Sequence, residues 1–375
     1  MKKVGIITYY RYYNYGTVLQ AHALQQAVSM LPDTKGELID YRFFKRANKS
    51  IWWYIKIRCK HVLHYVTQYK EVSRKLKYKN VFLEKRVAFE RFFEDYCQLS
   101  ANKYMLHEDL LNHPPSYDVY MVGSDQTWSP LIGLNSSMFL QFAPVGSHKV
   151  AYAPSIGVTA FNEEQKQYFR EALSSFQHIS CREDVGAEVL SSCYDGKVPT
   201  VLDPTLLLNS EQWSEIAVKP DIEGDYILCY LIGDRPYYRE YVRKLSKKMN
   251  CPAYYIPVSW RDVGEGNNLL PEAGPRDFLG LIKHAKCVCT DSFHGTIFSI
   301  NFNTNFYTFL KHAGGESASD NSRIVGILKK FGLESRLLSP QSAVAFEEID
   351  YAPVNARLEA LRAESWQYLK EAVDV

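Results

Sequence analysis

The sequence predicts an α/β protein made of two halves, each built on a parallel sheet. Short apolar runs of strand length alternate with helical segments along the chain, an alternation typical of parallel sheets covered by helices. The chain has 375 residues, whereas single domains most often have roughly 100–150. Its composition, 46% hydrophobic and 23% charged, is that of an ordinary globular protein. Pattern and length together therefore favour two α/β halves.

The first half begins with a strand, a loop, a helix and a second strand. We expect the strand at Val4–Thr8, followed by a loop rich in tyrosine, asparagine and glycine. Apolar residues at helical spacing predict a helix over 18–28, and Glu37–Asp40 is expected to form the next strand. Further strands are expected at Val119–Val122, Val150–Ala153, Ile179–Cys181 and Val201–Leu202.

A basic segment interrupts this half. Residues 42–91 contain 15 lysines and arginines, three glutamates and neither glycine nor proline. This composition predicts a helical insertion over about 42–112 in the first domain. Two interpretations stay open. The helices cap the sheet with their lysines in water, or they form a surface for an anionic membrane or a lipid-linked substrate, with Trp52 and Trp53 at the headgroups.

A second α/β unit follows a turn-rich linker at 209–225. Its strands are expected at Tyr226–Leu231, Ala253–Val258, Cys287–Thr290 and Phe306–Phe309. Its helices are expected at Tyr237–Met249, Phe278–Ala285, Thr296–Asn301 and Ser322–Phe331, with a last amphipathic helix at Val354–Ala372. The predicted organisation is a Rossmann-like domain over 1–215, a second over 222–345, and a terminal helix within 350–375 that packs back on the first domain.

Composition and motifs exclude several classes of protein. A net charge of +2 argues against a nucleic-acid binder. No run of 18 apolar residues is present, and the first apolar stretch is too short for a signal peptide. We therefore expect a cytoplasmic protein, peripheral on the inner face of the membrane if the basic segment binds there. The eight cysteines are scattered, which favours reduced thiols, and they show no zinc-site spacing. The sequence has no P-loop and no GxGxxG motif.

Four groups of polar residues follow predicted strands or open predicted helices. Ligands of parallel α/β sheets bind beyond the carboxyl ends of the strands, so these groups are the first candidates for a site. They are Asn14-Tyr15-Gly16, Gly123-Ser124-Asp125-Gln126, Ser180-Cys181-Arg182-Glu183 and Thr290-Asp291-Ser292-Phe293-His294-Gly295.

His294 is the strongest single candidate. It follows a buried strand at the start of a helix, where backbone N–H groups and the helix dipole favour an anion. An imidazole beside an anion is biased toward its protonated form and suits a general acid, and Gly295 permits close approach of a ligand. The alternative is that Asp291 or Ser292 only caps the helix and His294 packs against the sheet.

Arg182 and Asp125 are the next candidates. The guanidinium of Arg182, just past a strand, could clamp a carboxylate or phosphate, or it could form a surface ion pair with Glu183 or Asp184. Asp125 and Gln126 could bind the hydroxyls of a sugar, although Ser-Asp after glycine is also common in turns.

In this order, the four groups resemble the polysaccharide pyruvyl transferase family. The NYG, GSDQ, SxRE, DPT and DSFHG elements carry the resemblance, which covers most of the chain. The matching stretches are GIITYYRYYNYGTVLQAHALQQ (5–26), DVYMVGSDQTWSP (118–130), KVAYAPSIG (149–157), ISCRED (179–184), VLDPTLLL (201–208) and CVCTDSFHGTIFSINF (287–302).

The resemblance implies a two-domain fold similar to that of the GT-B glycosyltransferases. It also implies transfer of a pyruvyl group from phosphoenolpyruvate to two hydroxyls of a sugar, in a cell-surface polysaccharide or its lipid-linked precursor. A ketal forms and phosphate is released. No cofactor and no metal are implied, since phosphoenolpyruvate itself is the donor. The histidine of the family corresponds to His294 and its arginine to Arg182.

The sequence departs from the family pattern at one place. Other members often have an arginine two residues before the histidine, where this chain has Ser292. We expect Arg323 or Lys311 to supply the missing charge. The chemistry assigns His294 as acid and either Asp291 or Asp125 as base. Substrate contacts are expected from Asn14, Tyr15, Gly16, Ser124, Asp125, Gln126, Ser292, Gly295 and Arg323.

Two rival functions fit the same architecture. One is a GT-B-like glycosyltransferase that uses a nucleotide sugar, and the other is a non-catalytic sugar-binding protein of the same fold. Binding of nucleotide sugars compared with phosphoenolpyruvate distinguishes the first rival, and phosphate release in the presence of an acceptor distinguishes the second.

Overall fold

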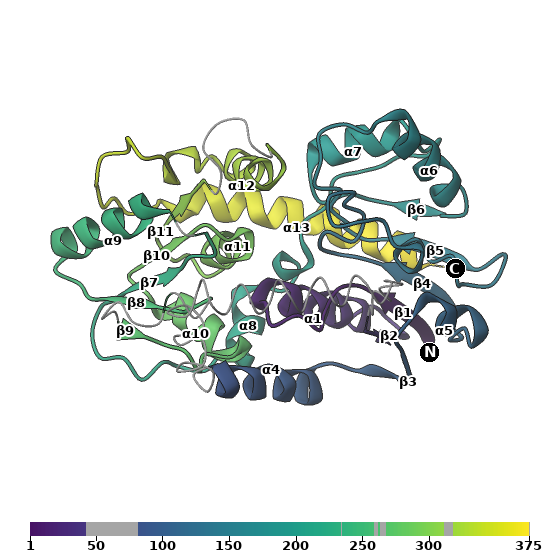
Figure 1. Cartoon of the computed structure of the whole chain (residues 1–375), viewed down its shortest axis with the longest axis horizontal. Coiled ribbons are helices and arrows are strands. Elements are labelled where there is room, and N and C mark those ends of the chain that lie inside the picture. Colours follow the sequence, from purple (N-terminus) through teal and green to yellow (C-terminus); the bar gives the residue numbers. More distant parts are fainter. Residues whose placement is uncertain (43–81, 234, 259–261, 263–267, 311–317, 375) are drawn as a thin grey trace, which may run out of the picture.

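A computed structural model describes residues 1–42, 82–233, 235–258, 262, 268–310 and 318–374. The strands form two six-stranded sheets, one in each half of the chain (Figure 1). Most of the basic segment predicted over 42–91, including both tryptophans, lies outside the described residues, and so does Lys311.

The first sheet is parallel throughout and has the strand order β3-β2-β1-β4-β5-β6. Its strands are β1 (Lys2–Ile7), β2 (Thr34–Tyr41), β3 (Leu99–Tyr104), β4 (Val119–Val122), β5 (His148–Ala151) and β6 (His178–Ile179). The helices of this half are α1 (Tyr15–Ser29), α4 (Leu83–Tyr96), α5 (His107–Asn112), α6 (Glu163–Leu173), α7 (Asp184–Ser191) and α8 (Ser210–Ile216), with the 3-10 helices η2 (Ser136–Phe139) and η3 (Pro204–Leu206).

The second sheet is also parallel, in the order β12-β11-β10-β7-β8-β9. Its strands are β7 (Ile227–Tyr230), β8 (Ala253–Tyr255), β9 (Asn268–Leu269), β10 (Cys287–Thr290), β11 (Phe306–Phe309) and β12 (Leu337–Leu338). The helices are α9 (Pro236–Met249), α10 (Pro275–His284), α11 (Phe293–Asn301), α12 (Ala318–Phe331) and α13 (Tyr351–Val373), with η4 (Glu334–Arg336). When each sheet's strands are numbered along the chain, both have the Rossmann order 3-2-1-4-5-6.

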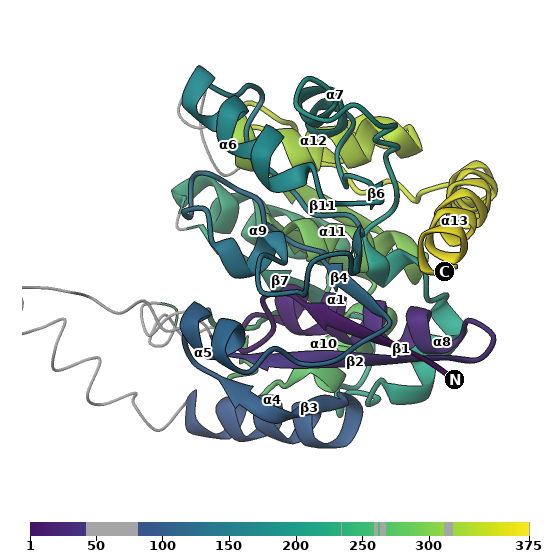
Figure 2. The same cartoon turned by 90° about the vertical axis from the view of Figure 1, so that its right-hand side faces the viewer.

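β3 lies inside the region predicted as a helical insertion. It pairs with β2 at one edge of the first sheet, and Figure 2 shows it beside α4 at one end of the molecule. Its middle residues, Ala101, Asn102 and Lys103, are exposed. The strand therefore lacks the apolar run from which the other strands were predicted.

The strand predicted at Val201–Leu202 is absent. Only a single bridge, between Cys181 and Thr200, extends the first sheet there. Proline has no N–H to donate to a strand, and Pro199 and Pro204 flank the segment, so further pairing is limited.

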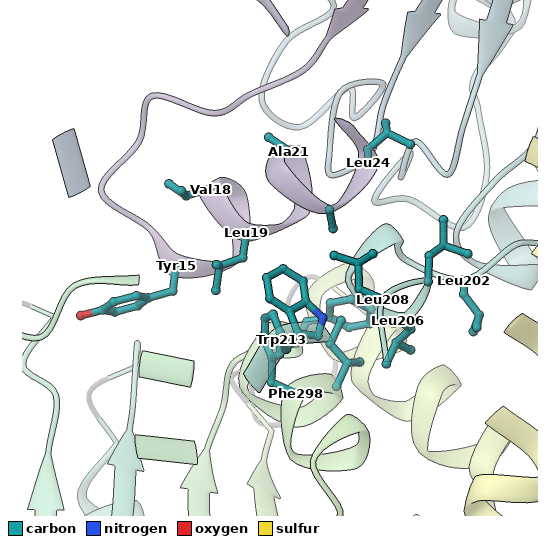
Figure 3. Close-up of a cluster of buried hydrophobic side chains, with 14 of the residues drawn as sticks. Tyr15, Val18, Leu19, Ala21, Leu24, Leu202, Leu206, Leu208, Trp213 and Phe298 are labelled. Atoms are coloured by element: carbon teal, nitrogen blue, oxygen red, sulfur yellow. The ribbon is translucent and has the colours of Figure 1, made fainter. Parts of the chain in front are cut away.

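Helix α1 lies between the two halves, and 13 of its 15 residues are buried. A helix that is buried on nearly all sides belongs to the core of a large protein. Besides its own sheet, α1 packs against η3, α10 and α11, and Figure 3 shows its apolar side chains beside Trp213 and Phe298. One hydrophobic cluster therefore spans both halves, and each half also has a separate cluster of its own.

Helix α13 runs along both halves (Figure 1). Near its start, the hydroxyl of Tyr351 donates to the carbonyl of Thr304 in the second half at 2.5 Å. Near its end, the hydroxyl of Tyr368 donates to the carbonyl of Ala151 in the first sheet at 2.9 Å. Helix α13 thus contacts the second half near its start and the first half near its end.

Candidate active site

The strand order reverses between β1 and β4 in the first sheet and between β7 and β10 in the second. In such sheets, ligands bind beyond the carboxyl ends of the strands at this switch point. Residues 123–126 follow β4, and residues 291–295 follow β10. Two of the polar groups selected from the sequence therefore stand at switch points.

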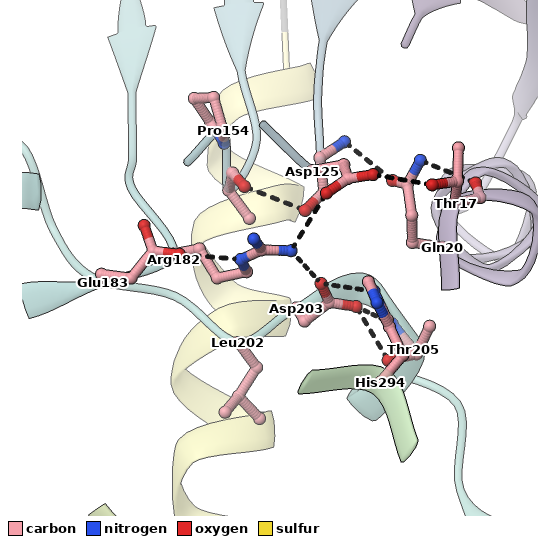
Figure 4. Close-up of polar contacts among 12 residues, drawn as sticks. Thr17, Gln20, Asp125, Pro154, Arg182, Glu183, Leu202, Asp203, Thr205 and His294 are labelled. Atoms are coloured by element: carbon pink, nitrogen blue, oxygen red, sulfur yellow. Dashed lines mark hydrogen bonds and ion pairs between the residues drawn. The ribbon is translucent and has the colours of Figure 1, made fainter. Parts of the chain in front are cut away.

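Side chains from both halves meet on one carboxylate, that of Asp203 (Figure 4). Its Oδ2 accepts a hydrogen bond from Nη1 of Arg182 at 2.8 Å and lies 3.5 Å from Nε2 of His294. Arg182 follows β6 in the first half, and His294 stands in the first turn of α11 in the second. Asp203 therefore brings the predicted arginine and the predicted histidine together.

The guanidinium of Arg182 is only 2% exposed and is held on two of its three nitrogens. Nε donates to Glu183 at 3.0 Å and Nη1 to Asp203, while Nη1 also lies 3.9 Å from Oδ1 of Asp125. Burial alone would lower the pKa of Arg182, but the charges of Glu183, Asp203 and Asp125 raise it above its usual value. The buried Nη2 has no hydrogen-bond partner among the described residues.

Asp203 is fixed from its other side by Thr205. Oδ1 accepts hydrogen bonds from the backbone N–H and the hydroxyl of Thr205, at 3.1 and 2.8 Å. Burial alone would raise the pKa of Asp203, but His294 and Arg182 outweigh this effect and hold the pKa well below its usual range. Asp203 is therefore a fixed negative charge in the interior.

A cavity of about 500 Å³ opens beside this junction. Asp203, Arg182 and Phe293 are among its lining residues, and α7, α12 and α13 contribute most of the others. Its basic lining residues are Arg182, Arg323, Lys329, Lys330 and Arg357, and its acidic ones are Glu183, Asp184, Glu188 and Asp203. Both the size and the mixed polar and apolar lining are those of a small-molecule site.

Asp125 lies at the same junction and is more accessible, with 14% of its side chain exposed. Its Oδ2 accepts a hydrogen bond from the hydroxyl of Thr17 at 3.0 Å. Ser124 is turned into the interior, where its hydroxyl donates to the carbonyl of Ala153 and its N–H donates to Oε1 of Gln20. Of this pair, only Asp125 presents a functional group toward the junction.

Two glycines stand close to the junction. A Cβ added to Gly16 would lie 2.0 Å from Nδ1 of His294, so only glycine fits beneath the imidazole. A Cβ added to Gly295 would lie 2.6 Å from the hydroxyl of Thr290. Gly295 therefore serves the packing of α11 on β10, whereas Gly16 directly contacts the histidine.

The remaining residues of the fourth group position the loops around the junction. The carboxylate of Asp291 is fully buried and accepts hydrogen bonds from the backbone N–H groups of Ile232 and Gly233, at 2.6 and 2.7 Å. Ser292 caps α11, since its hydroxyl accepts a hydrogen bond from the N–H of Gly295 at 3.3 Å. Asp291 thus joins the loops that follow β7 and β10.

Asn14 and Tyr15 are engaged at the start of α1. The side chain of Asn14 accepts a hydrogen bond from the N–H of Thr17 and caps the helix. Tyr15 is buried, stacks on Phe278 with 4.4 Å between ring centroids, and donates to the carbonyl of Ala273 at 2.5 Å. Tyr15 therefore joins the first half to the second inside the core.

Gln126 and Arg323 lie further out. Gln126 is partly exposed, and its Nε2 would lie 3.2 Å from a Cβ added to Gly157. Arg323 belongs to α12 and lines the cavity on the side facing Glu183 and Val185. Among the site residues predicted from the sequence, Arg323 is the one that brings a positive charge from the second half to the cavity.

Sequence reasoning missed two residues of the junction. Asp203 was included in a matching motif but was assigned no role, although an acid directly after an apolar pair follows the pattern of the other candidates. Gln20 was predicted only as a residue of the helix over 18–28, without a role of its own. Its amide group donates to Thr8, Tyr9 and Thr17 and accepts from Ser124, so it connects α1 to the ends of β1 and β4.

Neither a metal cluster nor a membrane span is found in the described ranges. No group of three or more His, Cys, Asp or Glu side chains there is arranged to hold a metal ion. No helix of these ranges is both long and apolar enough to cross a bilayer.

Several solved structures are similar to this chain at low sequence identity. A protein described as a UDP-N-acetylglucosamine 2-epimerase from Listeria monocytogenes is 11% identical, with a TM-score of 0.50 over 97% of this chain and 96% of that one. The UDP-GlcNAc 2-epimerase of Methanocaldococcus jannaschii is 12% identical, with a TM-score of 0.48 over 96% and 99%. The heptosyltransferase WaaC of E. coli is 13% identical, with a TM-score of 0.40 over 97% and 99%. The fold is therefore a two-domain α/β fold of GT-B type, as the sequence predicted.

Family membership is shown by sequence. No curated protein matches the chain, but the model of one family covers residues 14–310. This range contains Arg182, Asp203, His294 and their neighbours at the junction, together with the loops that follow β4 and β10. The protein belongs to the polysaccharide pyruvyl transferase family of transferases.

Proposed function

We propose that this protein transfers a pyruvyl group from phosphoenolpyruvate to two hydroxyls of one sugar, forming a ketal and releasing phosphate. The observation that carries the proposal is the meeting of Arg182 and His294, from different halves, on Asp203 beside a cavity of about 500 Å³. Family membership supports the reaction class.

The cavity offers cations for a donor that carries both a carboxylate and a phosphate. Nη2 of Arg182 is a buried donor without a hydrogen-bond partner among the described residues, and a guanidinium suits a planar carboxylate or a phosphate. Arg323 faces the same cavity from α12. In the proposal it supplies the charge that other family members place two residues before the histidine.

The proposed reaction uses one acid and one base. A sugar hydroxyl oxygen bonds to C2 of phosphoenolpyruvate, its proton passes to the base, and His294 donates a proton to the methylene carbon, which becomes a methyl group. A second hydroxyl of the same sugar then bonds to C2 as the bond from C2 to the phosphate oxygen breaks. Its proton returns to His294, while the base returns its proton to the leaving phosphate.

Asp125 is the better base of the two carboxylates considered. Both oxygens of Asp291 accept backbone hydrogen bonds, and the residue is fully buried. Asp125 is partly exposed and lies within 3.9 Å of Nη1 of Arg182. A general base must be able to reach the proton that it removes, and of the two carboxylates only that of Asp125 is partly exposed.

The competing donor is a nucleotide sugar, which some proteins of the same fold bind. A thermal-shift titration with phosphoenolpyruvate and with a panel of nucleotide sugars distinguishes the two donors. We expect stabilisation by phosphoenolpyruvate that is lost in Arg182→Ala. Stabilisation by a nucleotide sugar alone would favour the glycosyltransferase.

A further inference from the structure

We propose that Asp203 is a positioning residue that keeps the proton of neutral His294 on Nε2, so that Nδ1 is the nitrogen that exchanges a proton with substrate. The same carboxylate orients Arg182 so that its Nη2 remains available for the donor. The catalytic part of this inference rests on the proposed function, whereas the part that concerns the tautomer of His294 does not.

The first support is the fixed position of Asp203. Its side chain is 1% exposed, and Thr205 holds Oδ1 through two hydrogen bonds. Oδ2 is consequently aimed at the two residues on the other side, Arg182 and His294. An ionised carboxylate can accept hydrogen bonds but cannot donate them. The depressed pKa of Asp203 keeps its side chain ionised.

The second support is the orientation of the imidazole. Nε2 of His294 is buried and lies 3.5 Å from Oδ2 of Asp203, a distance that shortens to a hydrogen bond with a small movement. In neutral histidine one ring nitrogen carries the proton and the other accepts, and the partner of one nitrogen decides which. Because Oδ2 of Asp203 is the acceptor beside Nε2, the proton of the neutral ring is expected on Nε2 and the free lone pair on Nδ1.

The third support is the space around Nδ1. This nitrogen faces Gly16, and a Cβ at that position would lie 2.0 Å away. Any other residue would cover the nitrogen or push the ring away from Asp203. Glycine at this first turn of α1 thus lets the imidazole lie close to Asp203, with Gly16 in contact with its Nδ1 side.

The direct test is ¹⁵N NMR of protein labelled at its histidine rings. His294→Gln identifies the signals of His294 among the ten histidines. At a pH where His294 is neutral, we expect the wild-type protein to carry the proton on Nε2. A proton on Nδ1, or an equal mixture of the two tautomers, would overturn the proposal without any variant of Asp203 and without any enzyme assay.

Asp203→Asn removes the charge with little change of shape, and we expect it to convert His294 to a mixture of tautomers. Asp40→Asn is the matched control. Asp40 is equally buried and pairs with Arg11 and Arg42, but it does not contact the junction. We expect Asp40→Asn to leave the His294 signals unchanged. Unchanged signals in Asp203→Asn would show that Asp203 does not select the tautomer.

Enzyme kinetics then tests the catalytic consequence. We expect Asp203→Asn to lower kcat at least about 100-fold, because part of His294 then carries its proton on the wrong ring nitrogen. A residue that only supported the fold would lower the amount of active enzyme and leave the tautomer of His294 unchanged. If the wild-type enzyme releases no phosphate, the proposed function fails and the NMR result still decides the tautomer.

Discussion

The guanidinium of Arg182 lies over the ring of Phe293, with its Cζ 4.6 Å from the ring centroid. Arg182 comes from the first half of the chain, and Phe293 is the first residue of α11 in the second half. The ring therefore supports the arginine from one face while Glu183 and Asp203 hold its edge. This contact gives a role to the residue that directly precedes His294.

Phe293→Leu should weaken phosphoenolpyruvate binding by about 2- to 30-fold, because a cation–π contact contributes about 0.5–2 kcal/mol and leucine removes it without removing the apolar volume. Isothermal titration of the donor measures the change. Phe93→Leu is the matched control, since Phe93 also lies beneath an arginine, Arg11, at 5.5 Å from its ring centroid, but outside the cavity. Equal affinity of wild type and Phe293→Leu for phosphoenolpyruvate would show that the stacking contact does not contribute to donor binding.

Arg182→Lys should weaken phosphoenolpyruvate binding almost as much as Arg182→Ala, by at least about tenfold, because an ammonium cannot use three fixed nitrogens at once. Lysine keeps a positive charge near Asp203, so this variant separates loss of geometry from loss of charge. Donor affinity measured in both variants gives the answer, with Arg336→Lys as a control at a buried arginine outside the cavity lining. Full rescue by lysine would mean that Arg182 acts only as a point charge.

The sequence predicted most of the fold because the two sheets are made of apolar strands joined to amphipathic helices. It failed at β3, where three exposed residues interrupt the apolar pattern, and at Val201–Leu202, where flanking prolines limit pairing. It also did not predict β9 and β12, the two-residue strands at the edges of the second sheet. All of these places lie at sheet edges. Edge strands are less apolar than central ones, and local patterns therefore identify them least well.

Only part of the candidate site was predicted from the sequence. Arg182 and His294 stand directly after strands, so the general rule for parallel sheets selects them. Their common partner, Asp203, lies on a segment without regular strand pairing, and its role depends on contacts between residues about 20 and 90 positions apart in the chain. Such contacts are set by tertiary packing, which no local pattern encodes. The same holds for Asp291, whose two backbone partners belong to the loop after β7.

The stability of the fold should fall as the pH is lowered from about 6.5 to 4, in part because of His22. Burial lowers the pKa of His22 from 6.5 to about 4. Between these values the unfolded chain binds a proton that the folded protein does not, so unfolding is favoured, by about 3 kcal/mol for the full shift. Chemical denaturation over this pH range should show a smaller loss in His22→Gln than in wild type. The exposed His113→Gln serves as control, and identical pH slopes in all three proteins would contradict the assignment.

The basic segment over 42–91 remains a prediction, since residues 43–81 lie beyond the described part of the chain. If it binds an anionic membrane, the protein should sediment with anionic vesicles at low salt and not with neutral ones, because each basic residue near the surface contributes about 1 kcal/mol. Changing Lys56, Arg58 and Lys60 to Glu should abolish the difference. The same change at the exposed Lys244, Lys247 and Lys248 of α9 should not. Equal behaviour with both kinds of vesicle would favour helices that only cap the sheet.

The most direct test of the central claim is phosphate release from phosphoenolpyruvate in the presence of a panel of glycosides and lipid-linked sugars, with mass spectrometry of the product. Wild type should release phosphate only with an acceptor that carries two suitable hydroxyls, and the product should be heavier by one pyruvyl ketal. His294→Ala should fold, since Asp203 keeps its ion pair with Arg182, and should lose about 10²- to 10⁴-fold or more in turnover. Wild-type turnover in His294→Ala, or phosphate release without ketal formation, would contradict the account.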